Sequence, residues 1–128
     1  MSKAYAEESV IGSLIMTDGD AMDDIPAALD ASMFRDEICA TAFGIYQAAR
    51  ETEEKVGAAL LTQRLAARTG IPIGSIETRL REFIGMASTT TISDNAKEII
   101  KSHKAKQLSD TLNRIEVNSD NLGETLTI

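Results

Sequence analysis

The chain has 128 residues, a net charge of −7, 43% apolar and 26% charged residues, and a single cysteine. This composition is ordinary for one folded domain, and it excludes a wholly disordered chain and a disulfide framework. Tryptophan is absent and other aromatic residues are few. The core must therefore rest on leucine, isoleucine, alanine and methionine, which favours helices over a sheet.

The first half of the chain predicts three helical segments. AEESVIGSLIM has helical apolar spacing, and we expect Glu7 and Glu8 in its first turn, where the helix dipole favours acids. TDGD breaks this helix, and MDDIPAAL predicts a short second one with Pro26 in its first turn. DASMF is a connector of about one turn. The longest helix of this half is expected over residues 35–51.

The second half predicts two shorter helices and a long one. A helix over 58–68 should stop at Gly70, and Pro72 should open the next. After the polar loop MASTTTISDN, a helix over about 94–117 would be about 36 Å long, too long to lie wholly on so small a head. We divide the chain into a helical head (1–92), a long helix (93–117) and a polar tail (118–128), which we expect to be flexible or truncated.

The long helix carries an apolar stripe that predicts a contact with another chain. A projecting helix with such a stripe needs a partner to cover it. The residues expected at this oligomer interface are Ile99, Ile100, His103, Leu108, Leu112 and Ile115.

The stretch LAARTGIPIGSIETRLREF has the spacing of a DNA-binding helix-turn-helix, with Ala66 four residues before Gly70 and Ile76 six after it. A DNA-binding module centred on residues 58–86 is therefore one alternative, and a stand-alone helical adaptor is another. Against DNA binding, Glu77 and Glu82 offset the arginines of the second helix, and a groove-reading helix normally carries a clearer basic stripe. We expect no strong direct DNA binding.

The sequence contains no recognisable catalytic motif. The sequence has no GxxxxGK[ST] loop to cradle ATP phosphates. His103 is the only histidine and Cys39 the only cysteine, and together they would supply at most half a zinc site. We expect no enzyme activity, no cofactor and no metal. We also expect no membrane span, because no long apolar run occurs, and a cytoplasmic location.

Four motifs, in order, resemble the N-terminal domain of the bacterial and phage replicative DNA helicases of the DnaB family. They are AEESVIGSLIM, the pair Phe34 and Phe43, Val56 followed by LTQRLAAR, and ISDNAKEIIKSHKAKQL. The resemblance covers about residues 4–116. The family's histidine in the second motif falls at Cys39 here, and its tyrosine in the fourth falls at Asn95.

The resemblance implies an all-α fold: a compact bundle of about six helices followed by a long helix that forms half of a helical hairpin. It implies a non-catalytic collar that pairs, with a dimer expected for the isolated domain and three pairs in a hexamer. It also implies binding to primase, and to a helicase loader in some systems. A complete helicase of this family continues into an ATPase domain.

Charge suggests where a partner would dock. Residues 1–54 carry 12 acids and 3 bases, a net charge of −9, whereas residues 55–115 carry 5 acids and 10 bases, a net charge of +5. Such a dipolar surface can steer a protein partner. The residues expected at the docking surface are Arg79, Arg81, Lys97, Lys101 and Lys104.

Overall fold

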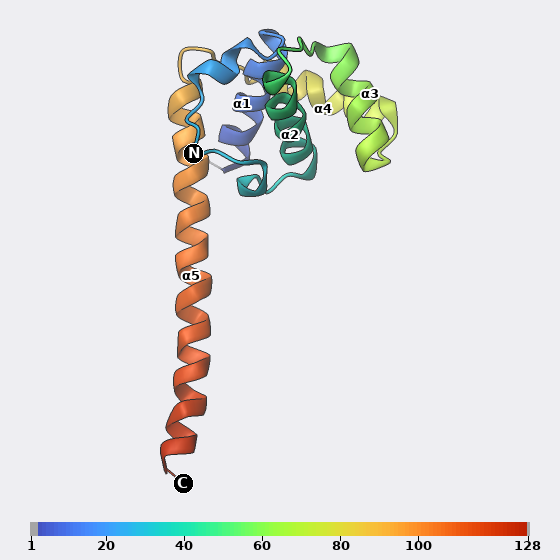
Figure 1. Cartoon of the computed structure of the whole chain (residues 1–128). Helices are drawn as coiled ribbons and strands as arrows, with labels where there is room; N and C mark the ends of the chain where they lie inside the picture. The colour runs from blue at the N-terminus through green and yellow to red at the C-terminus, as the bar shows by residue number, and fades with distance from the viewer. Residues whose placement is uncertain (1–2, 128) are drawn as a thin grey trace.

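The computed structural model describes the backbone of residues 3–127 and the side chains of residues 5–114. This part of the chain is helical and contains no strand, so the all-α prediction is confirmed. Four α-helices form a head, from which α5 projects far to one side (Figure 1). The helices are α1 (Lys3–Met16), η1 (Asp20–Asp24), η2 (Ala31–Met33), α2 (Glu37–Glu51), α3 (Ala58–Thr69), α4 (Ile73–Gly85) and α5 (Ile92–Thr127), where η denotes a 3₁₀ helix.

Helix α1 is the centre of the head and packs against α2, α4 and the start of α5. It is buried on nearly all sides, which is typical of a helix inside a bundle. Its small residues meet both neighbours closely. An alanine in place of Gly12 would put its Cβ 1.9 Å from the Phe83 carbonyl oxygen of α4. Ser9 accepts a hydrogen bond of 3.1 Å from the Asn95 amide of α5.

The turn between α3 and α4 follows the sequence prediction. Gly70 has a φ of 73° and ends α3 in the left-handed conformation that glycine adopts without strain. Pro72 is the N-cap residue of α4. Its fixed φ suits the entry to a helix, so both ends of this turn are set by local chemistry.

Two predictions in the first half are wrong. Residues 22–29 do not form a helix: η1 ends at Asp24, and Ile25 is extended with φ −95° and ψ 130°. The reason is Pro26, whose ring pushes the preceding residue out of the helical region. Helix α1 begins at Lys3, so Glu7 lies beyond its first turn.

Helix α5 is longer than its sequence predicts. It continues to Thr127, so residues 118–127 are helical rather than a separate tail. Asparagine, serine and glycine there each cost less than about 1 kcal/mol of helix propensity, and no proline interrupts the backbone hydrogen bonds. Its 36 residues span about 54 Å.

Candidate interaction surfaces

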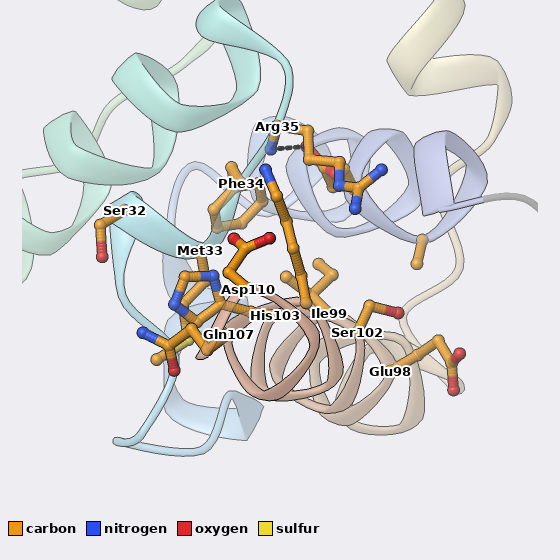
Figure 2. Close-up of a pocket in the computed structure, with 13 residues that line it drawn as sticks. Ser32, Met33, Phe34, Arg35, Glu98, Ile99, Ser102, His103, Gln107 and Asp110 are labelled. Atoms are coloured by element: carbon orange, nitrogen blue, oxygen red, sulfur yellow. Dashed lines mark hydrogen bonds between the residues drawn. The ribbon is translucent and has the colours of Figure 1, made fainter. Parts of the chain in front are cut away.

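A hollow of about 600 Å³ lies in the corner between the head and α5. One wall is the segment 32–35, and the other is the face of α5 that turns toward the head. Figure 2 shows Met33 and Phe34 opposite His103 and Asp110 across this hollow. The lining mixes acidic, basic and apolar groups, which is the chemistry of a protein contact and not of a small apolar ligand site.

Glu7 holds the head wall of this hollow in place. Its side chain is buried, and its Oε1 accepts hydrogen bonds from the backbone N–H groups of Arg35 (2.9 Å) and Asp36 (3.1 Å). Burial raises the pKa of the Glu7 carboxyl, although these two hydrogen bonds act in the opposite direction. The ring of Phe34 packs against the ring of Phe43, and the two ring centroids are 4.9 Å apart. The wall is therefore preformed.

The residues predicted for the oligomer interface do not share one surface. Ile99 and Ile100 are buried in the core of the head, and His103 is half-buried in the hollow. Leu108 and Leu112 are 61% and 52% exposed. The side chain of Ile115 lies outside the described residues.

Helical phase explains this separation. Nine residues separate Ile99 from Leu108, which is two and a half turns at about 3.6 residues per turn. The two side chains therefore point to opposite sides of α5. Ile99 is buried in the core of the head, so Leu108 faces away from the head, and the exposed leucines lie beyond it along α5.

The five residues predicted for docking are also divided. The Arg79 guanidinium is already engaged, 2.6 Å from an Asp36 carboxylate oxygen and 3.6 Å from one of Glu8. It also lies over the Phe83 ring, 4.9 Å from its centroid. Arg81 lines a groove between α3 and α4 on another part of the head. The three predicted lysines are exposed along α5: Lys97, Lys101 and Lys104.

The helix-turn-helix spacing corresponds to a real helix pair, α3 and α4, joined at Gly70. Of the side chains that α4 would offer to DNA, four are exposed: Ser75, Glu77, Thr78 and Arg81. Arg79 faces the acids of α1 and α2 instead. Arg81 is therefore left with Glu77 beside it, which is a poor match to a phosphate backbone.

The groove between α3 and α4 was not predicted from the sequence. It holds about 400 Å³ and has Ile73 and Ile84 at its edges. Both are isoleucines of α4 that stay exposed, while Ile76, Leu80 and Phe83 fill the core. Ile73 and Ile84 lie off the buried face of α4. Their position in the helical repeat was the one sequence feature that could have indicated the groove.

The two departures from the resemblance are packing positions. Cys39 is fully buried, and burial raises the pKa of its thiol, so it remains an uncharged core residue. Asn95 is buried with its amide donating to Ser9 and Thr91. Among the described residues no group of histidine, cysteine or acidic side chains is arranged to hold a metal ion.

These features describe an all-α head with a projecting helical arm and surfaces suited to protein contacts. A sequence profile described as the DnaB-like helicase N terminal domain matches residues 2–104. The chain therefore belongs to the family of DnaB-like helicase N-terminal domains. Comparison with curated proteins and with solved structures found no match. No helix in the described part of the chain is both long and apolar enough to cross a membrane.

Proposed function

We propose that this chain is a non-catalytic collar domain of a replicative DNA helicase, which holds copies of the helicase together and docks primase or a loader. Membership of the family supports the helicase role. The observation that carries the proposal is the pair Leu108 and Leu112 on an arm that extends beyond the head. In water these leucines cost free energy that a second chain would recover, about 1.5–3 kcal/mol for each fully buried side chain.

The docking role rests on the exposed lysines of α5 and on the uneven charge of the chain. Lys97 and Lys101 lie four residues apart, and so on one side of the helix, at the level of the head. An acidic partner surface would be steered to them, while the strongly acidic residues 1–54 would repel nucleic acid. Arg79 is engaged in ion pairs within the head, so it does not belong to the proposed docking surface. The same proposal places the chain in the cytoplasm.

The docking role is tested by titrating the chain with the C-terminal domain of its own organism's primase. We expect binding in the micromolar range, with an association rate that falls as salt is added. The double variant Lys97→Glu, Lys101→Glu should weaken it. The control Lys55→Glu changes an exposed lysine that pairs with Asp20 elsewhere on the head, and should leave the affinity unchanged.

A parallel titration with duplex DNA separates this proposal from the helix-turn-helix alternative. Tight, salt-sensitive DNA binding that is lost in Arg81→Ala, together with no binding of primase at high concentration, would contradict the collar proposal. That result would identify α4 as a DNA-binding helix.

A further inference from the structure

The α3–α4 groove is apolar along its length. Ile73 and Ile84 lie at its two ends on α4 and are 51% and 37% exposed, while Leu80 between them is buried. The two isoleucines are eleven residues apart, so the groove runs for about 16 Å, or three turns of helix, along α4. Figure 1 shows α5 leaving the head on the side opposite α3, so the chain's own arm does not cover this groove.

Charge occupies only one side of the groove. The α3 side is formed by small or uncharged residues: Ala58, Ala59, Thr62 and Gln63. The α4 side carries Glu77 and Arg81, which are both exposed and lie one turn apart. Helical phase puts both on the same side of the line that joins the two isoleucines. Neither forms an ion pair with the residues whose side chains the structure describes, so both charges are available to a partner.

These features together define the chemistry of a partner. We propose that the α3–α4 groove receives an amphipathic helix of another protein, antiparallel to α4. Beside its apolar stripe this helix carries an acidic residue and, four residues later, a basic one. The site is separate from the lysines of α5 and goes beyond the proposed function, because it adds a second docking surface on the far side of the head.

The direction of the partner helix follows from the order of the two charges. Along α4, Glu77 precedes Arg81. An antiparallel helix meets Arg81 first and Glu77 second, so its acid must come before its base. This is also the more stable order within a single helix, since an acid four residues before a base stabilises the helix on its own. A parallel partner would need the less favourable order.

The shape of the groove suits a helix. The small side chains of Ala58 and Ala59 let a helix approach α3 closely, so its apolar stripe can pack between the two isoleucines of α4. A three-turn helix presents apolar residues at steps of three and four, which matches the length of the groove. The apolar stripe would then provide most of the affinity, and the two charges would fix the direction and register.

The arm of a second copy does not carry this pattern. On α5, only Asp110 is followed four residues later by a base, which is Arg114. Asp110 lines the hollow beside the head and is about half a turn around the helix from Leu108 and Leu112. A second arm therefore cannot bring its leucines and this charge pair into the groove together.

The test uses two synthetic peptides of about three to four helical turns, with leucines at steps of three and four residues. The acid-first peptide carries a glutamate beside the leucines and a lysine four residues later. In the base-first peptide these two residues are exchanged, so composition and net charge stay the same. Each peptide carries a fluorescent label, and its anisotropy is followed as the whole chain is added.

The native chain should bind the acid-first peptide at least about fivefold more tightly than the base-first peptide, because two charge pairs change from attractive to repulsive. The double variant Glu77→Arg, Arg81→Glu should reverse this preference. Both residues are exposed, so the head should stay folded. A native chain without the preference, or a preference that the double variant does not reverse, would overturn the inference.

A second variant tests the apolar part of the groove. Ile73→Asp places a charge at the first residue of α4, where the helix dipole favours an acid, so the head should stay folded. It should weaken binding of both peptides at least about tenfold. Ser75→Asp adds the same charge in the same turn, is exposed and does not line the groove, so it should not change binding. Peptides that bind Ile73→Asp as well as the native chain, or that do not bind the native chain, would overturn the inference.

Sedimentation separates this inference from the proposed function. Ile73→Asp should self-associate as the native chain does, because the collar proposal rests on Leu108 and Leu112. If the peptides fail to bind while Leu112→Asp still weakens self-association, the groove inference fails and the proposed function stands. Loss of self-association in Ile73→Asp would make the groove a contact between copies and would also overturn the inference.

Discussion

Gly12 shows how closely single residues determine the packing of the head. It lies where α1 crosses α4, and an added Cβ would meet the carbonyl group of Phe83. This obstacle is backbone, which cannot rotate away as a side chain can. The position therefore accepts no larger residue unless the two helices move apart.

We expect Gly12→Ala to lower the free energy of unfolding by about 3 kcal/mol, because the whole helix contact must shift. Gly74→Ala is the control, since a Cβ at Gly74 on α4 has no neighbour within 4 Å. That change should stabilise the protein by about 0.5–1 kcal/mol through helix propensity. Urea unfolding followed by circular dichroism measures both, and equal effects of the two variants would contradict the close crossing.

The local roles of Gly70 and Pro72 could be predicted from the sequence, whereas the distant role of Glu7 could not. Gly70 and Pro72 mark the turn between α3 and α4 through their own backbone preferences. Glu7 binds the backbone of Arg35 and Asp36, which are 28 and 29 residues away. No spacing rule connects residues so far apart, so its position alone suggested an acid in the first turn of a helix.

Arg79 connects three helices of the head. It extends from α4 to the acids Glu8 on α1 and Asp36 at the start of α2. The other carboxylate oxygen of Asp36 accepts from the backbone N–H of Cys39 and caps α2. One carboxylate therefore serves both a helix cap and an interhelical ion pair.

Removing this junction should loosen α4 without unfolding the head. We expect Arg79→Ala to cost about 1–2 kcal/mol of stability, a value reduced by the partial exposure of the ion pair. Arg81→Ala, two residues further on and exposed in the groove, should stay within about 0.5 kcal/mol of the native protein. Thermal unfolding of the two variants compares them directly. A larger loss in Arg81→Ala would mean that the arginines have been assigned the wrong roles.

Helix α5 illustrates what apolar spacing can and cannot predict. Its existence and its projection follow from its length and from the small size of the head. Its apolar residues were assigned to one stripe because most of the steps between them are three or four residues. The step from His103 to Leu108 is five residues, about 1.4 turns, so Ile99 belongs to the core and Leu108 to the outside. Only contact with α1 fixes which face is buried.

At the scale of the whole molecule, a head with its own core carries an arm that lies mostly outside it (Figure 1). The fold class and the projecting helix followed from composition and periodicity. The hollow beside His103 and the α3–α4 groove did not, because each is formed by segments that only tertiary packing brings together. Both lie on surfaces that a partner can reach.

Sedimentation of the chain over a range of concentrations most directly tests whether the arm joins one copy to another. The native chain should associate as concentration rises, Leu112→Asp should weaken this at least about tenfold, and Ser109→Asp should not. Ser109 is exposed on the same helix and lies off the face that carries Leu108 and Leu112, so it controls for an added charge. A native chain that remains monomeric at every concentration, or two variants that behave alike, would contradict the proposed collar.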